Sequence, residues 1–198
     1  MDFASELVRR GLMLIGTFKL TSGKESPYYI DLRRLPSHVD LFGEVVNRAL
    51  EILRGVDYDY VVGVATGGVP LASFIACRTG KPMGYVRQEK KGHGTSRLVE
   101  GEAKGRKVLL VDDVATTGGS LRNSVEALRA EGAEVVAALV VVDRQEGAKG
   151  LIEGMGVKFL SVYRVSELLG SLLNSNLIGE GDKENIRKYL QENAVGLS

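Results

Sequence analysis

The feature that most constrains the fold is a short apolar run that stops at two adjacent acids and a glycine-rich loop. The run is Val108 to Val111, and it continues as Asp112-Asp113-Val-Ala-Thr-Thr-Gly-Gly-Ser120. A continuous apolar block of this length is typical of a parallel strand that is covered on both faces. An amphipathic segment begins near Leu121, so the order predicts a strand, a loop and a helix. The acids and the loop then lie at the carboxyl edge of a sheet, where open α/β folds bind ligands.

The loop has the chemistry of an anion site. Thr116, Thr117 and Ser120 offer hydroxyls, and Gly118 and Gly119 leave backbone N–H groups open at the start of a helix, which favours a phosphate. Carboxylates repel phosphate, so the acid pair suits sugar hydroxyls or a metal ion better. No G-x-x-x-x-G-K-[ST] motif occurs, which argues against a nucleoside triphosphatase. Phosphoribosyl pyrophosphate fits these groups, because it carries a phosphate, a cis-diol and a polyphosphate that binds Mg²⁺.

Composition narrows the class of protein. A chain of 198 residues suits one domain, and a formal charge of +1 argues against a nucleic-acid or anionic-membrane partner. Cys77 is the only cysteine, so no internal disulfide is possible, and we expect this side chain in the core. The longest apolar block, residues 137–142, is too short to span a bilayer. We therefore expect a cytoplasmic protein.

Apolar strand-like runs alternate with helical periodicity along most of the chain, and this alternation predicts parallel pairing. We expect a helix over 4–14, irregular strands over 18–31, and then an α/β core. The expected core strands are 60–65, 83–87, 108–111, 134–142 and 157–162. The prediction is a five-stranded, mostly parallel sheet flanked by helices.

A basic segment follows the second core strand, at the edge where ligands bind. It runs from Arg87 to Gly101 and carries Gln88, Lys91 and His93. A solvated connector is the plain alternative for such a charged loop. Its position favours binding, because cations that close over a leaving pyrophosphate stabilise the charge that develops in the transition state.

The segment from Val108 to Ser120 resembles the phosphoribosyl-pyrophosphate signature of type I phosphoribosyltransferases. Two further segments are similar to the orotate phosphoribosyltransferases within that family: Leu20-Thr-Ser-Gly-Lys-Glu-Ser-Pro-Tyr-Tyr29 and Val141-Val-Asp-Arg-Gln-Glu-Gly147. The resemblance implies the type I phosphoribosyltransferase fold in one domain. A small N-terminal hood would span about 1–36, the core about 37–173, and a C-terminal helical segment about 174–198.

The resemblance also implies an activity. It is the transfer of the ribose 5-phosphate group from phosphoribosyl pyrophosphate to orotate, giving orotidine 5′-monophosphate and pyrophosphate in pyrimidine biosynthesis. Mg²⁺ would be the cofactor, with no preformed protein site: the substrate would hold it mainly, and Asp112, Asp113 and water are the candidates for the remaining contacts. A homodimer is implied, in which the basic loop of one subunit reaches the other subunit's site.

Site residues follow from the same resemblance. The implied catalytic residues are Lys91, His93, Asp112 and Asp113. The implied phosphoribosyl-pyrophosphate ligands are Arg87, Gln88, Lys91, His93, Asp112, Asp113, Val114, Ala115, Thr116, Thr117, Gly118, Gly119 and Ser120. The implied orotate ligands are Thr116, Arg144 and the backbone near Tyr29 and Ile30. Arg144 has a physical argument as well, because a guanidinium can meet the carboxylate of orotate with two hydrogen bonds.

The chain departs from the family pattern at three positions. Thr21, Gly67 and Gln88 stand where bacterial members often carry a cation. Two alternatives to the orotate enzyme stay open: a purine-type phosphoribosyltransferase, and a regulator that binds phosphoribosyl pyrophosphate as a signal. The purine-type enzyme should lack the hood segment and Arg144, and a regulator has no need of Lys91 and His93.

Overall fold

The computed structural model describes residues 2–19, 25–88 and 97–193. The helices are α1 (Phe3–Arg9), the short 3₁₀ helix η1 (Leu35–Ser37), α2 (Val39–Ile52), α3 (Gly68–Thr79), α4 (Gly119–Ala130), α5 (Ala148–Gly154), α6 (Val165–Leu173) and α7 (Glu180–Glu192). The strands are β1 (Met13–Lys19), β2 (Glu25–Ile30), β3 (Tyr60–Val64), β4 (Met83–Val86), β5 (Val99–Glu100), β6 (Lys107–Ala115), β7 (Glu134–Asp143) and β8 (Lys158–Arg164).

The central sheet has the order β5-β4-β3-β6-β7-β8, and every pair is parallel except β4 with β5. The mostly parallel sheet is confirmed, but the expected number of five strands is one too small. The sixth strand, β5, is only two residues long and lies inside the segment interpreted as a basic loop. Arg87 and Leu98 begin this antiparallel pairing, since the Arg87 N–H donates to the Leu98 carbonyl at 2.8 Å.

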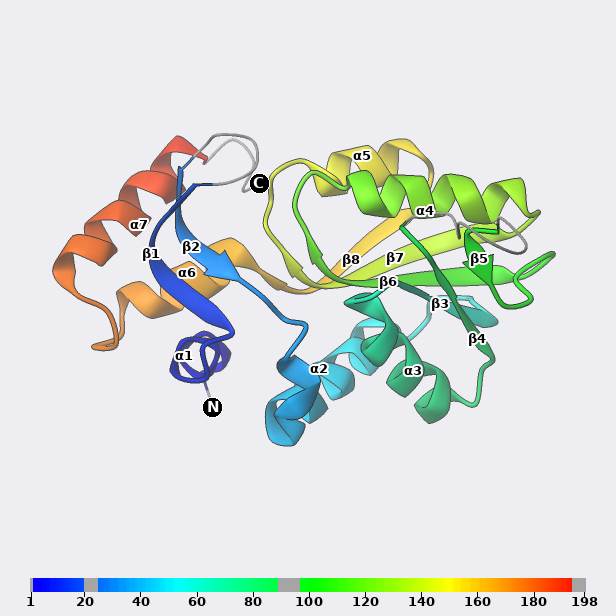
Figure 1. Cartoon of the computed structure of the whole chain (residues 1–198), viewed down its shortest axis with the longest axis horizontal. Coiled ribbons are helices and arrows are strands. Elements are labelled where there is room, and N and C mark those ends of the chain that lie inside the picture. Colours follow the sequence, from blue (N-terminus) through cyan, green and yellow to red (C-terminus); the bar gives the residue numbers. More distant parts are fainter. Residues whose placement is uncertain (1, 20–24, 89–96, 194–198) are drawn as a thin grey trace.

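Helices cover both faces of this sheet, with α4 and α5 on one side and α2 and α3 on the other (Figure 1). Successive residues of a strand alternate between the two faces. Val61 and Leu109 pack in the cluster under α2 and α3, whereas Val62 and Leu110 pack in the cluster under α4 and α5. Since both faces are buried, the strands show continuous apolar runs in the sequence.

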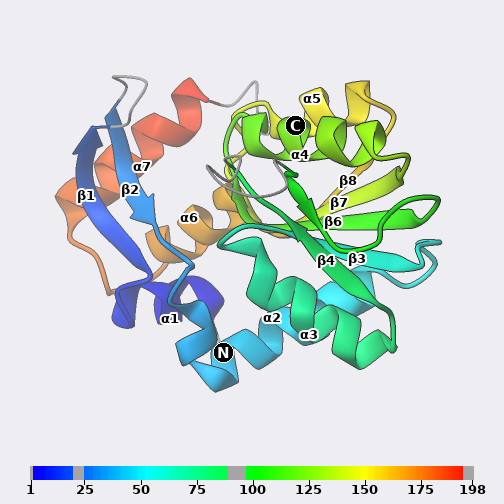
Figure 2. The ribbon, with the colours of Figure 1, turned by 45° about the vertical axis from the view of Figure 1, so that its right-hand side comes forward.

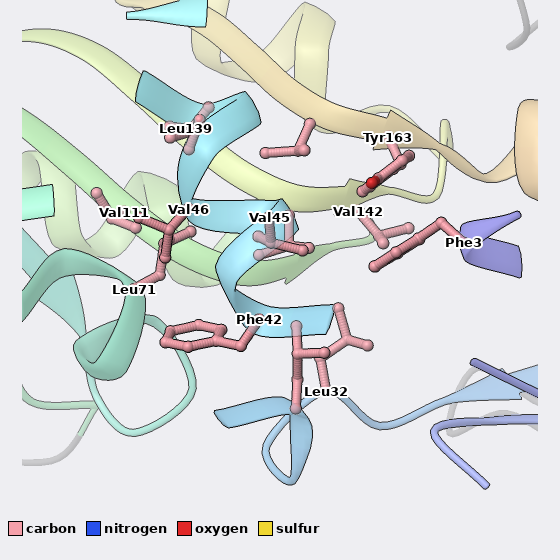
Figure 3. Close-up of a cluster of buried hydrophobic side chains, with 14 of the residues drawn as sticks. Phe3, Leu32, Phe42, Val45, Val46, Leu71, Val111, Leu139, Val142 and Tyr163 are labelled. Atoms are coloured by element: carbon pink, nitrogen blue, oxygen red, sulfur yellow. The ribbon is translucent and has the colours of Figure 1, made fainter. Parts of the chain in front are cut away.

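The larger cluster is built around α2. Val45 and Val46 of this helix face the sheet, with Val46 beside Val111, and Phe42 points toward Leu71 of α3 (Figure 3). All five side chains are buried, and burial of each stabilises the fold by about 1.5–3 kcal/mol. This packing buries one face of β6 and β7 next to the edge that carries the acid pair.

A second, two-stranded sheet lies beside the core, with β1 antiparallel to β2 (Figure 2). The helix expected over 4–14 is too long, because α1 ends at Arg9 and Met13 already pairs with Ile30 in the sheet. The C-terminal helix α7 packs against β2, and α6 packs against α1. The N-terminal and C-terminal segments therefore form one structure next to the core.

Within the described residues, no helix is both long enough and apolar enough to cross a membrane.

Candidate active site

The acid pair lies on a strand where one of its two neighbours has ended. The last pair between β3 and β6 joins Gly63 to Val111, whereas β7 stays paired with β6 as far as Ala115. The expectation that the strand ends at Val111 is therefore wrong, because pairing with β7 keeps the next four residues extended. Asp112 and Asp113 consequently stand at the place where the β3 side of the strand opens.

Asp112 is buried, and hydrogen bonds from backbone N–H groups compensate only part of the negative charge of the acid pair. Its Oδ1 accepts the backbone N–H of Asp113 at 2.9 Å, and Oδ1 of Asp113 accepts that of Val114 at 2.8 Å. Burial, together with the negative charge of Asp113, raises the pKa of Asp112 well above its ordinary value. A ligand that brings hydroxyl donors or positive charge would offset this cost of ionising the pair.

The acid pair is suited to Mg²⁺ only as a partial site. Carboxylate oxygens are the ligands that Mg²⁺ prefers, but the ion normally keeps waters and phosphate oxygens as well. Among residues 2–19, 25–88 and 97–193, no group of three or more acids, histidines or cysteines is placed to hold a metal. Asp112 and Asp113 thus fit an ion that arrives with other ligands.

The loop after β6 forms a cradle at the start of α4. Gly118 has a φ of +85°, and a Cβ there would lie 3.0 Å from the backbone of Ala148, so a larger residue would be strained in two ways. The cradle has a volume of about 300 Å³. Its lining comprises Asp112, Val114, Ala115, Thr116, Thr117, Gly118, Gly119, Ser120 and Leu121. Open N–H groups at the first turn of α4 make the cradle suitable for a phosphate.

Arg144 lies next to this cradle. Its backbone N–H donates to the carbonyl of Ala115 at 2.9 Å, so Arg144 is anchored to the residue that precedes Thr116. The side chain is buried, and its Nε donates to the hydroxyl of Tyr28 at 3.1 Å and to Oε1 of Glu146 at 3.0 Å.

One nitrogen of the Arg144 guanidinium has an unusual environment. Nη2 lies 2.8 Å from Oε1 of Glu146, which is an ion pair by distance. The N–H directions do not meet that oxygen, so the buried Nη2 has no hydrogen-bond partner among the described residues. The ion pair with Glu146 compensates part of the cost of burying this nitrogen, and a ligand carboxylate would supply the hydrogen bond that it lacks.

Arg87 lies at the base of the basic segment. Its Nε donates to Glu100 at 2.9 Å, and its Nη2 donates to the hydroxyl of Tyr85 at 3.0 Å. Gln88 is described and exposed. Lys91 and His93, the two expected catalytic residues of this segment, lie outside the described residues, as does Thr21.

The orotate segment of β2 presents its two tyrosines to opposite sides. Tyr29 is 40% exposed and Ile30 is half-buried, and both pair through their backbones with β1. It is Tyr28, fully buried, whose side chain reaches Arg144. The interpretation of the sequence did not include Tyr28, because alternation along a strand predicts that Tyr28 and Tyr29 face opposite sides and not which of the two is buried.

Comparison with known proteins identifies the family of this chain. Residues 42–154 match the family model described as the phosphoribosyl transferase domain. The orotate phosphoribosyltransferase of Sulfurisphaera tokodaii is 55% identical over 98% of this chain and 99% of its own length. The chain belongs to the orotate phosphoribosyltransferase family.

Solved structures of orotate phosphoribosyltransferases share the fold. That from Aeropyrum pernix has a TM-score of 0.80 and 46% sequence identity, and the match covers 88% of this chain and 99% of that chain. That from Mycobacterium tuberculosis, in complex with 5-phospho-α-D-ribosyl 1-diphosphate, has a TM-score of 0.69 and 35% identity over 85% and 99% of the two chains. Membership of the orotate family favours the orotate enzyme over the purine-type alternative.

Proposed function

We propose that this chain transfers the 5-phosphoribosyl group of phosphoribosyl pyrophosphate to orotate, giving orotidine 5′-monophosphate and pyrophosphate. A ring nitrogen of orotate forms the new bond to the anomeric carbon, the bond from that carbon to pyrophosphate breaks, and orotate loses the proton of that nitrogen. The observation that carries the orotate assignment is the buried Arg144 guanidinium, whose Nη2 has no hydrogen-bond partner among the described residues and which stands beside the phosphate cradle.

Each part of phosphoribosyl pyrophosphate has a counterpart in the site. The 5-phosphate suits the N–H groups and hydroxyls of residues 116–120, at the first turn of α4. The ribose hydroxyls suit Asp112 and Asp113, because ionised carboxylates accept hydrogen bonds from hydroxyls. Arg144 and Thr116 then meet the base on the other side of the anomeric carbon, with the guanidinium on the orotate carboxylate.

The leaving group needs positive charge. As pyrophosphate departs, negative charge builds on its oxygens. Cations that contact these oxygens only at that stage stabilise the transition state more than the ground state. Arg87 is the described residue at the base of the segment that we assign to this role, with Lys91 and His93 as its further members. His93 also offers a proton, since the ordinary pKa of histidine is about 6.5.

Mg²⁺ belongs to the proposal as a cofactor that arrives on the substrate. When bound to the pyrophosphate oxygens it neutralises charge on the leaving group. Asp112 and Asp113 are the residues of this chain that would contact it, directly or through water. We also propose a cytoplasmic homodimer in which the segment after Arg87 serves the partner subunit's site.

A screen of acceptor bases tests the function. The purified protein is incubated with phosphoribosyl pyrophosphate and Mg²⁺, and with orotate, uracil, hypoxanthine or adenine in separate reactions, and pyrophosphate release is measured. We expect turnover with orotate and little or none with the others. Turnover of a purine but not of orotate would establish the purine-type enzyme instead, and no turnover with any base would favour the regulator.

A further inference from the structure

Four side chains from distant parts of the chain form a closed ring of polar contacts around Arg144. Tyr28 comes from β2, Arg144 and Glu146 from the turn after β7, and Tyr189 from the C-terminal helix α7. Arg144 Nε contacts Tyr28 and Glu146, the hydroxyls of Tyr28 and Tyr189 lie 3.3 Å apart, and the Tyr189 hydroxyl lies 3.3 Å from Oε1 of Glu146. Three structural elements therefore converge on one guanidinium.

The hydrogen atoms of the ring have one consistent arrangement. Glu146 is an acceptor only, so the Tyr189 hydroxyl donates to it. The single hydroxyl proton of Tyr189 is then used, so the Tyr28 hydroxyl donates to Tyr189 and accepts from Arg144. Burial raises the pKa of both Tyr28 and Tyr189, so both hydroxyls keep their protons near neutral pH. Every hydroxyl in the ring has a defined partner.

This arrangement restrains how the guanidinium is turned. Nε hydrogen-bonds Tyr28 and Glu146, Cζ lies over the aromatic ring of Tyr28 at 4.9 Å from its centroid, and Nη2 lies 2.8 Å from Oε1 of Glu146 without a hydrogen-bond partner among the described residues. An arginine side chain has many rotamers, and holding it in one of them before the ligand arrives reduces the entropy cost of binding. The ring of polar contacts thus holds the Arg144 guanidinium in place before the ligand binds.

We propose that Tyr189 is a positioning residue for recognition of the orotate carboxylate, acting through Glu146 and Tyr28 on Arg144. The inference rests on the proposed function, in which Arg144 binds that carboxylate. It makes α7, which the active-site motifs do not include, part of the specificity for bases that carry a carboxylate. The Tyr189 ring packs edge-on against the Tyr28 ring, with centroids 5.5 Å apart, so packing and positioning can be separated by removing the hydroxyl alone.

The variant Tyr189→Phe keeps this packing and removes the hydroxyl. Its readout is the ratio of affinities for orotidine 5′-monophosphate and UMP, which differ only in the carboxylate, measured by calorimetry. We expect Tyr189→Phe to lower this ratio about three- to tenfold through weaker binding of orotidine 5′-monophosphate, with UMP affinity and the KM for phosphoribosyl pyrophosphate unchanged. A merely structural role would move both affinities together or neither.

Tyr163→Phe is the matched control. The hydroxyl of Tyr163 in β8 also donates to a glutamate, Glu44 of α2, at 3.2 Å, and neither residue is one of the four that surround the Arg144 guanidinium. It should leave the ratio at the wild-type value. If Tyr189→Phe does not fold, as judged by its melting curve, Tyr28→Phe removes the neighbouring hydroxyl and should lower the ratio in the same way.

The variant Arg144→Ala distinguishes a failure of the proposed orotate function from a failure of the positioning role of Tyr189. If Arg144→Ala keeps the wild-type ratio, Arg144 does not read the carboxylate, and the proposed orotate assignment fails. If Arg144→Ala abolishes the preference while Tyr189→Phe, or the Tyr28→Phe substitute, keeps it at the wild-type value, the assignment of Arg144 stands and the positioning role is overturned.

Discussion

Gly67 lies against the carboxylate of Asp113 so closely that a Cβ atom on residue 67 would overlap it. The backbone of Gly67 is in the ordinary right-handed region, with φ −65° and ψ −35°, so any residue could adopt its conformation. A side chain at residue 67 would therefore disturb Asp113, whereas the backbone would not oppose it. The cation that bacterial relatives often carry at this position cannot be added here unless Asp113 moves.

We expect Gly67→Ala to displace Asp113 and to lower kcat/KM for phosphoribosyl pyrophosphate about ten- to a hundredfold, because small misplacements of a binding group are costly in catalysis. Steady-state kinetics with varied phosphoribosyl pyrophosphate measures the effect. Gly43→Ala is the control, since nothing lies within 4 Å of a Cβ at Gly43 in α2, and it should keep wild-type kinetics and add up to about 1 kcal/mol of stability. Equal kinetics for the two variants would contradict this account of Gly67.

Arg144→Ala should weaken orotate binding by about 1.5–3 kcal/mol, as for a lost hydrogen bond to a charged group, and should affect phosphoribosyl pyrophosphate much less. Arg144→Lys should restore little, because an ammonium group cannot replace the planar fork. Both variants also leave Tyr28 and Glu146 without their shared partner, so we expect a lower melting temperature. Separate binding titrations with the two substrates make the comparison, and equal losses for both would refute the assignment.

Asp112→Asn should stabilise the fold at neutral pH while it abolishes activity. The pKa of Asp112 is raised in the folded protein, so the protonated acid contributes fully to the free energy of unfolding at low pH. This contribution is lost as the pH rises through the folded pKa. An asparagine does not ionise, so the advantage of the variant in unfolding free energy should grow from about pH 4 upward. Urea unfolding at pH 5 and pH 8 tests the trend, and a constant difference would contradict it.

Asp40→Asn is a control for which we expect the opposite dependence of stability on pH. Arg10 hydrogen-bonds the Asp40 carboxylate and lowers its pKa, so the stability from this pair is present above the unfolded pKa and is lost as the pH falls. Asp40→Asn should therefore be less stable than the wild type at pH 8. The difference should shrink toward low pH.

Calorimetry should detect no tight binding of Mg²⁺ to the protein alone, because the two acids offer too few ligands. Binding should become measurable when phosphoribosyl pyrophosphate is present. Asp113→Asn should weaken the ternary binding without changing the result for the protein alone. Tight Mg²⁺ binding in the absence of the substrate would mean that a preformed metal site exists.

Mixed dimers test whether the segment after Arg87 serves the partner subunit. Lys91→Ala and Asp113→Asn homodimers should both be inactive. When equal amounts exchange subunits at random, half of the dimers are mixed, and each holds one complete site, so about a quarter of all sites should recover activity. Mass spectrometry confirms the exchange. Absence of recovery in exchanged samples would show that Lys91 acts within its own chain.

The helix α3 shows where sequence periodicity stops being informative. The expectation that Cys77 lies in the core is wrong, because Cys77 is exposed, and Phe74 on the same helix is 52% exposed. Apolar residues occur on nearly all sides of α3. A pattern without a polar face cannot indicate which side packs on the sheet. The length of β6 was underestimated for a related reason, since pairing with β7 and not hydrophobicity extends the strand through the acids.

The sequence by itself determined the parts of this protein that depend on neighbours along the chain. The apolar strand, the two acids, the glycine-rich loop and the helix start all lie within residues 108–121, so local patterns predicted the cradle and its anion chemistry. Only the tertiary structure decided the surroundings of Arg144. Tyr28 is 116 positions from Arg144 and Tyr189 is 43 positions from Glu146, and no periodicity links residues that chain folding alone brings within hydrogen-bond distance.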